Sequence, residues 1–196
     1  MAGDTPGPAP LDLHQAAVLV GAYSAIERRL FELTGTLAAE ADTVPEIAVF
    51  LDSLSGEHAW HAELWADRLP VVAGIDAQAL VVVPPAAREV LDGLDRGDQV
   101  EKMAGLFRVA LPRLVASYGY HEAYASAASE APTRRALRLV LRDEAEALVA
   151  GEALVQGLLG TPEAVAAAGQ RVIDLESELV KAGVFLGLVP WPGRRG

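Results

Sequence analysis

Three of the four histidines fall where helical spacing turns them toward apolar side chains. His58 and His61 are three residues apart, so on a helix they share one face, which also carries Trp65. His121 lies one turn after Tyr118 on a second apolar face. Burying an ionisable side chain is costly unless it is paired or bound to a metal ion. These histidines are therefore the first candidates for metal ligands.

Carboxylates fall on the same predicted faces. Glu27 and Glu144 each lie within an apolar stripe, and Glu122 is adjacent to His121. At about 1.5 Å per residue, antiparallel helices bring Glu27 and His58 to comparable depth. Imidazoles and carboxylates from several helices suit iron, manganese or zinc, and a six-coordinate site with open positions suits iron or manganese. The candidate metal ligands are Glu27, His58, His61, Glu122, Glu144 and, as an alternative to Glu122, His121.

The composition limits the other chemistry that is available. The chain has 196 residues, 52% of them hydrophobic and 22% charged, which predicts one globular domain with a substantial core. Its net charge of −11 argues against nucleic acid and anionic membranes as partners. Because there is no cysteine, disulfides, thiolate nucleophiles, iron–sulfur clusters and cysteine-based zinc sites are excluded. Any metal ion must bind to histidine and carboxylates.

Several further classes are disfavoured by what the chain lacks. Residues 1–10 have neither the basic flank nor the apolar stretch of a secretion signal. No apolar run approaches the roughly 18 residues of a membrane span, so we expect a cytoplasmic protein that does not enter a membrane. No glycine-rich phosphate loop or nucleophile elbow is present, which makes nucleotide-dependent enzymes and serine hydrolases poor candidates.

Apolar residues recur at three- and four-residue steps and predict an all-α protein. Pro112 should kink the third helix, and the fifth should turn Val165, Val172, Leu175, Leu179 and Phe185 inward. The connection over 71–97 is long enough to cross from one end of a bundle to the other. We therefore expect a four-helix bundle with a long crossover between helices two and three and an additional C-terminal helix. The predicted helices span about 11–41, 46–69, 98–129, 134–159 and 163–186; the predicted organisation is a flexible segment over 1–10, a single domain over 11–187 and an irregular tail over 188–196.

The stretch HAWHAELWADRL, which begins at His58, resembles the second helix of ferritin-like proteins. The similarity is greatest to actinobacterial MiaE-like relatives of tRNA hydroxylases, which carry Glu-x-x-His followed by similar Glu-Leu and Asp-Arg-Leu residues. In this alignment His61 matches the metal-binding histidine, and His58 stands where the family has glutamate. The resemblance implies a ferritin-like bundle with a non-haem metal site.

The same resemblance assigns the remaining ligands. Glu27 matches the first-helix carboxylate, Glu122 or His121 matches the third-helix ligand, and Glu144 matches the first residue of the second Glu-x-x-His motif. Position 147 is alanine where that motif has histidine, so a symmetric di-iron site is not expected. An altered dinuclear site, a mononuclear site and a bundle without metal all remain open.

Two classes of function follow. The first is a non-haem iron or manganese oxidoreductase, an oxidase or hydroxylase acting on a small molecule; the resemblance leaves tRNA open as a substrate, although the acidity argues against it. The second is a non-catalytic ferritin-like module without a cofactor, a homodimer or small-molecule binder in which His58 and His61 are hydrogen-bonded to Glu27 and Glu144. We expect a homo-oligomer in either case. A basic stripe is expected to pair with surface carboxylates; it consists of Arg134, Arg135, Arg138 and Arg142.

Overall fold

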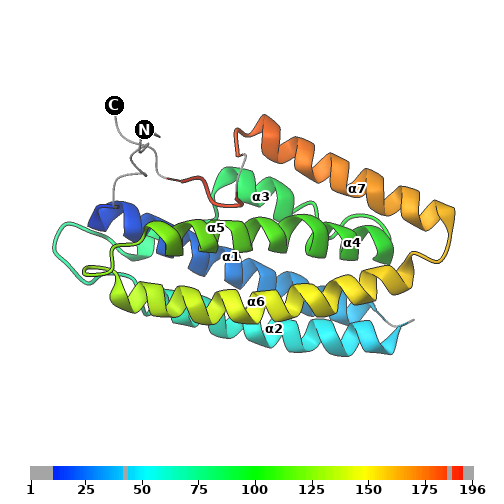
Figure 1. Cartoon of the computed structure of the whole chain (residues 1–196), viewed down its shortest axis with the longest axis horizontal. Coiled ribbons are helices and arrows are strands. Elements are labelled where there is room, and N and C mark those ends of the chain that lie inside the picture. Colours follow the sequence, from blue (N-terminus) through cyan, green and yellow to red (C-terminus); the bar gives the residue numbers. More distant parts are fainter. Residues whose placement is uncertain (1–10, 42–43, 185–186, 192–196) are drawn as a thin grey trace, which may run out of the picture.

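The computed structural model describes residues 11–41, 44–184 and 187–191, and every regular element within these ranges is helical (Figure 1). The all-α prediction is therefore confirmed. None of the helices in these ranges combines the length with the apolar character that crossing a bilayer requires. The elements are α1 (Leu13–Glu40), α2 (Pro45–Ala66), the 3-10 turn η1 (Gln78–Leu80), α3 (Pro85–Leu91), α4 (Gln99–Gly105), the π-helical η2 (Leu106–Ala110), α5 (Leu111–Tyr124), α6 (Ala131–Leu158) and α7 (Pro162–Lys181).

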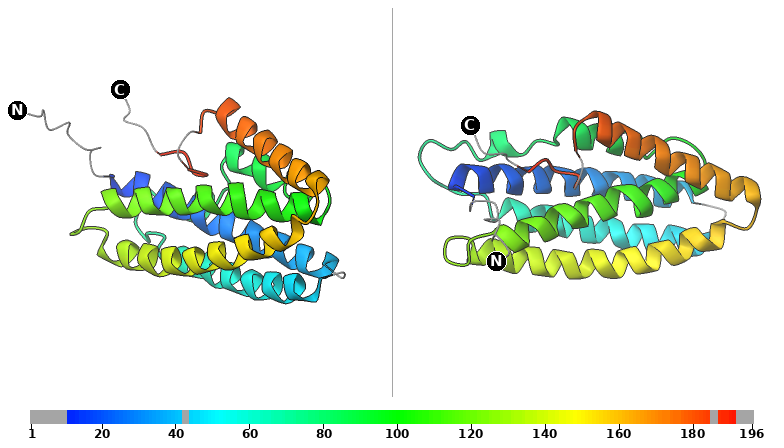
Figure 2. Two further views of the ribbon diagram at one scale, coloured as in Figure 1. Left: turned by 45° about the vertical axis from the view of Figure 1, so that its right-hand side comes forward. Right: turned by 45° about the horizontal axis from the view of Figure 1, so that its top comes forward.

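Four long helical segments lie side by side: α1, α2, the continuous run α4–η2–α5, and α6 (Figures 1 and 2). Helices α1 and α2 form an antiparallel pair, and so do α5 and α6. The connection over 67–98 returns along the length of the bundle, so that α4 and α5 run in the same direction as α2 (Figure 1). Helix α7 packs outside the four, against α3 and α4.

Side-chain caps define where several helices begin. Asp12 accepts a hydrogen bond from the Gln15 backbone N–H and starts α1, and Asp98 does the same for Glu101 at the start of α4. Thr161 accepts from the Ala164 backbone N–H at the start of α7. Because side chains project at fixed angular steps, these starting points set which positions of each helix face inward.

The predicted helix boundaries were wrong in places. The helix expected over 98–129 ends at Tyr124, because Glu130 accepts a hydrogen bond from the Ser126 backbone N–H and stabilises a turn. The predicted disturbance at Pro112 takes the form of the wider turn η2, where the Leu111 N–H bonds to the Leu106 carbonyl. The last helix ends at Lys181; its predicted end, and Phe185, lie outside the described residues, as does the segment 1–10.

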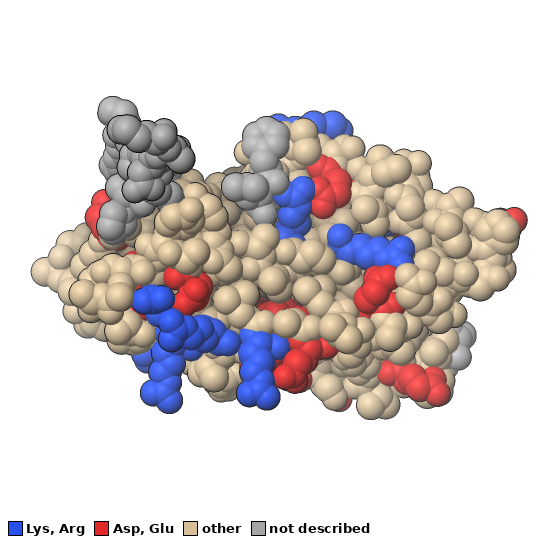
Figure 3. Space-filling view, viewed as in Figure 1, with Lys and Arg blue, Asp and Glu red and all other residues tan. Residues whose placement is uncertain are grey.

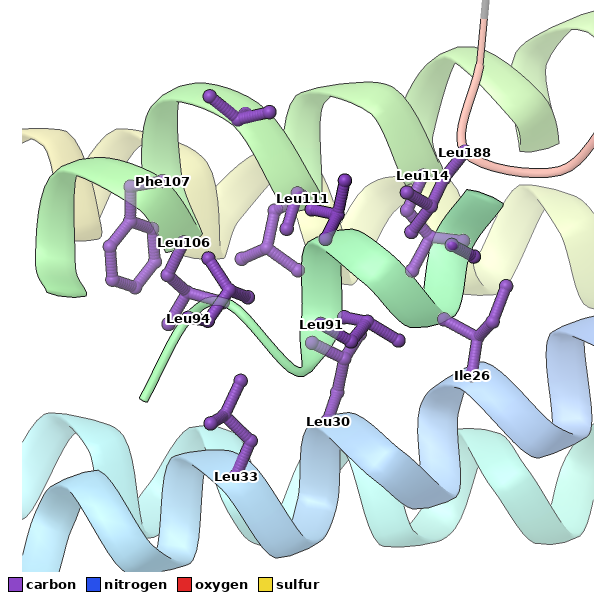
Figure 4. Close-up of a cluster of buried hydrophobic side chains, with 14 of the residues drawn as sticks. Ile26, Leu30, Leu33, Leu91, Leu94, Leu106, Phe107, Leu111, Leu114 and Leu188 are labelled. Atoms are coloured by element: carbon purple, nitrogen blue, oxygen red, sulfur yellow. The ribbon is translucent and has the colours of Figure 1, made fainter. Parts of the chain in front are cut away.

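The core extends from the bundle to the crossover and the C-terminal segment. Helix α3 inserts its apolar face between α1 and the α4–α5 run (Figure 4). The Leu188 N–H donates to the Arg113 carbonyl, which fastens residues 187–191 to α5. On α7, Leu175 and Leu179 are buried as predicted, whereas Val165 is 52% exposed and that expectation was wrong. The side chains labelled in the core are Ile26, Leu30, Leu33, Leu91, Leu94, Leu106, Phe107, Leu111, Leu114 and Leu188 (Figure 4).

Candidate metal centre

Four of the six candidate ligands meet inside the bundle. Glu27 comes from α1, His58 and His61 from α2, and Glu144 from α6. Each offers one nitrogen or oxygen atom, and these four atoms all lie within 4.8 Å of one another. Every one of the four side chains is at most 1% exposed. The structure therefore brings two imidazoles and two carboxylates together around one point.

The ring atom that faces this point is the same in both histidines. His58 Nδ1 lies 2.6 Å from Glu27 Oε2 and 3.5 Å from Glu144 Oε1. His61 Nδ1 lies 3.6 Å from Glu27 Oε1 and 3.4 Å from Glu144 Oε1. The lone pair of an unprotonated Nδ1 and a carboxylate lone pair are both suitable donors to a transition-metal ion.

The pairing of α1 with α2 sets the depth of the cluster. The Ser24 hydroxyl donates to the Ala62 carbonyl across 3.0 Å, and Ser24 and Ala62 are both buried. Ser24 is one turn before Glu27, and Ala62 directly follows His61. This hydrogen bond holds the two helices in the register that places Glu27 beside the histidines.

Two side chains that sequence reasoning did not assign to the site support it. The Tyr118 hydroxyl on α5 donates to Glu27 Oε1 across 2.5 Å, and Asp143 Oδ2 on α6 lies 3.3 Å from His61 Nε2. Tyr118 stacks on Trp65, with ring centroids 5.4 Å apart, and is fully buried. The available signals were the inward position of Tyr118 in the helical pattern and the adjacency of Asp143 to Glu144.

The charges in the cluster are tightly linked. Burial by itself would raise the pKa of Glu27, but the charges and hydrogen bonds of His58 and His61 outweigh it and lower this pKa to about 2. Burial by itself would lower the pKa of His61, but Glu144 and Glu27 raise it to about 10. Glu144 and Glu27 likewise outweigh burial at His58 and raise its pKa. Burial raises the pKa of Glu144. Without a metal ion, the imidazoles therefore hold their protons strongly.

Several polar atoms of the cluster lack hydrogen-bond partners among the described residues. They are both carboxylate oxygens of Glu144, Nδ1 of His61 and Nε2 of His58. A buried polar atom left unsatisfied costs about 1–3 kcal/mol. A cation coordinated by Glu144 and by Nδ1 of His61 would satisfy these atoms apart from Nε2 of His58, because the His58 nitrogen that faces the cluster is Nδ1. The donor set and its unsatisfied atoms therefore fit a bound metal ion.

The other two candidates, His121 and Glu122, do not join the cluster. His121 Nε2 lies 3.1 Å from Glu130 Oε1, within the turn that follows α5. Glu122 accepts hydrogen bonds from Arg134 and Arg138 on α6. Both residues lie one turn beyond Tyr118, which takes the inward position beside Glu27. The structure therefore places neither predicted ligand in this cluster.

The basic stripe on α6 is paired at three of its four positions. Arg134 and Arg138 bond to Glu122, and Arg142 lies 3.1 Å from Glu146. In the view of Figure 3, Lys and Arg side chains lie next to Asp and Glu side chains over the region where Figure 1 shows α6. For these three arginines the expected pairing with surface carboxylates is confirmed.

Comparison of the chain with protein-family models, with curated proteins and with solved structures finds no significant match.

Proposed function

We propose that this protein is a ferritin-like bundle that binds one iron or manganese ion and uses it to oxidise a small molecule. The observation that carries the proposal is the sealed cluster of Glu27, His58, His61 and Glu144, with both oxygens of Glu144 unsatisfied. The helix order, with its end-to-end crossover, supports the resemblance to the ferritin-like plan.

One ion fits this donor set better than two. The four ligand atoms all lie within 4.8 Å of one another. A second ion would need further ligands, but Ala147 occupies the position of a second motif histidine, and Glu122 is engaged by arginines. Two nitrogens and two oxygens suit iron or manganese, and four protein ligands leave open positions in an octahedron.

Such an ion, when bound, supplies redox chemistry with dioxygen at its open positions. The residues of the chain orient and protect it. The Tyr118 hydroxyl holds Glu27, the Asp143 carboxylate accepts from His61 Nε2, and the fully buried Trp65 helps to exclude water.

A second candidate is a non-catalytic module whose polar interior is a hydrogen-bonded cluster. The observation that favours it is Glu27, which is satisfied without metal because His58 bonds to one of its oxygens and Tyr118 donates to the other. This hypothesis leaves Glu144 with only the longer contacts of 3.5 Å to His58 and 3.4 Å to His61, because neither of its oxygens makes a well-formed hydrogen bond among the described residues.

The first experiment measures metal content by elemental mass spectrometry on protein purified without a histidine tag. We expect about one iron or manganese ion per chain, or stoichiometric uptake of Fe²⁺ or Mn²⁺ under anaerobic conditions. Glu144→Gln, which keeps the size of the side chain, should lose the ion. His14→Ala is the matched control, because His14 is exposed and distant in sequence from the cluster.

A wild-type protein that binds neither ion, with His61→Ala merely less stable, would contradict the proposal and favour the second candidate.

In a second experiment, the metal-loaded protein is exposed to dioxygen, and the rate of Fe²⁺ oxidation is compared with that of free Fe²⁺ in the same buffer. Acceleration in the wild type that is absent in Glu144→Gln supports redox use of the site. Binding without acceleration would contradict the oxidative role and leave metal binding intact.

A further inference from the structure

The candidate metal centre is sealed, so an ion needs a path to it. All four ligands are at most 1% exposed. Among the described residues, two further side chains make polar contacts with them: Tyr118 is fully buried, whereas the Asp143 side chain is 35% exposed. Asp143 therefore connects His61 to solvent.

Asp143 also lines a groove of about 230 Å³ between α2 and α6. We call this the α2–α6 groove; its lining includes Leu54 and Glu57 from α2, and Asp143, Glu146, Ala147 and Ala150 from α6. Leu54 is one turn before His58, and Ala147 is one turn after Glu144. The floor of the groove is thus one helical turn from two of the ligands.

The shape and charge of the groove suit a small cation. Ala147 and Ala150 have short side chains, so the space beside them stays open. Glu57, Asp143 and Glu146 place three carboxylates on its walls, and Arg142, which pairs with Glu146, offsets part of that charge. Clefts lined by one sign of charge raise the local concentration of the opposite ion.

A different cavity, of about 200 Å³, offers no comparable path. It lies between α1, α5 and the C-terminal segment, and its lining includes Leu19, Tyr23, Val184, Val189 and Trp191 but no carboxylate. A hydrated divalent cation would find no charged partner there. The acidic groove is therefore the better candidate.

We propose that the α2–α6 groove is the route by which a divalent cation reaches the candidate metal centre, with Asp143, beside His61, as the carboxylate that lies between the groove and the ligands. This inference rests on the proposed metal site and adds the path to it. A route determines how fast an ion enters and leaves, whereas the ligands determine how tightly it is held. Narrowing the groove at a position that contacts no ligand should therefore alter the two rates and leave the equilibrium affinity unchanged.

The first test narrows the groove. Uptake and release of Co²⁺ by the full chain are followed by stopped-flow absorption for wild type and Ala147→Met. We expect both rates to fall by the same factor, with an unchanged Kd. Ala16→Met is the matched control: it places the same side chain in another groove, of about 280 Å³, at the N-terminal end of α1, and should behave as wild type.

If Ala147→Met does not fold, Ala150→Met serves instead, because Ala150 is exposed and lines the same groove.

The second test removes negative charge from the groove with Glu57→Gln and Glu146→Gln together. We expect uptake to slow by about tenfold at low ionic strength and the difference to shrink at high salt. The exposed pair Glu89→Gln and Glu163→Gln removes the same charge elsewhere and should have little effect.

If the narrowed and the charge-depleted variants both take up and release Co²⁺ at the wild-type rates, the proposed route is wrong. The proposed metal site would not be affected by that result. For the narrowed variant, a fall in affinity equal to the fall in uptake rate, with an unchanged release rate, would also overturn the route. A wild-type protein that takes up no Co²⁺, Fe²⁺ or Mn²⁺ would instead contradict the proposed function. The two failures are therefore distinguishable.

Discussion

The two ring nitrogens of His61 face different partners. Nε2 lies 3.3 Å from Asp143, and Nδ1 faces Glu27 and Glu144. A hydrogen bond from Nε2–H to the Asp143 carboxylate leaves the Nδ1 lone pair directed at the candidate metal position. Asp143 is thus a positioning residue as well as the exposed end of the route.

We predict that Asp143→Ala lowers metal affinity by about 10–100-fold, the usual cost of losing such a partner. Asp143→Asn retains an acceptor oxygen and should recover part of the affinity. Glu146→Ala, on the same helix but paired with the exposed Arg142, should leave the equilibrium affinity as in wild type. Isothermal titration with Mn²⁺ gives all four values. Equal affinities for the alanine variant and the wild type would contradict the positioning role.

Protons should compete with the metal ion. The pKa of His61 is raised to about 10 and that of His58 is also raised, so both imidazoles must release protons on binding. We predict that affinity increases between pH 6 and 8, by up to about tenfold per pH unit for each proton released. Titrations in buffers of different ionisation enthalpy count these protons. An affinity independent of pH would mean that the histidines are not ligands.

Helical spacing predicted which residues of α1, α2 and α6 reach the site, because the helices there are regular and their inward positions repeat. On α5 it failed to separate Tyr118 from His121. Tyr118 and His121 are three positions apart on α5 and both fully buried, so spacing alone does not show which of them reaches the cluster. The partner of His121 is Glu130, from a turn with no periodic signal. The contact of Asp143 with His61 depends on the distance between helices, which a single-chain pattern does not contain.

At the scale of the elements, the crossover docks on α1 through a close backbone contact. A Cβ atom added to Gly21 would lie 2.3 Å from the Leu80 carbonyl oxygen in η1. We predict that Gly21→Ala destabilises the protein by about 1–3 kcal/mol, since backbone must shift to relieve the overlap. Urea unfolding measures the change.

Gly157→Ala in α6 is the control, because an added Cβ there meets nothing within 4 Å. The higher helix propensity of alanine should make that variant more stable by about 0.5–1 kcal/mol. If Gly21→Ala were equally stabilising, the crossover would not pack against α1 at this position.

The long helices were predictable because many turns of consistent periodicity define each of them, and the length of the 71–97 connection correctly indicated an end-to-end crossover. The docking of α3 into the core was not predictable. Its seven residues, Pro85–Leu91, are too few for a periodic signal, although Ala87, Val90 and Leu91 are fully buried. The helix end expected near residue 129 failed because Glu130 bonds back to Ser126 and competes with further helix.

At the scale of the whole molecule, the cluster joins α1, α2 and α6, so its protonation should affect global stability. In the metal-free protein the raised pKa of His61 stabilises the fold fully below its unfolded value of 6.5, and this contribution is lost as the pH rises toward 10. The lowered pKa of Glu27 contributes above 4.5 and is lost as the pH falls toward 2. The raised pKa of the buried Glu144 also makes the folded state less stable as the pH rises.

We therefore predict that the melting temperature of the metal-free protein falls between pH 6.5 and 9.5. Metal binding acts in the opposite sense, because its contribution to the free energy of unfolding grows as the affinity rises with pH. This contribution reaches about 2.7 kcal/mol at a free metal concentration 100 times Kd. The gap between the metal-free and Mn²⁺-loaded melting curves should widen from pH 6 to 8 in scanning calorimetry. His61→Gln should abolish this widening and flatten the metal-free decline. Parallel curves in the wild type would show that the metal ion binds without displacing the protons of the cluster, and would place it away from His58 and His61.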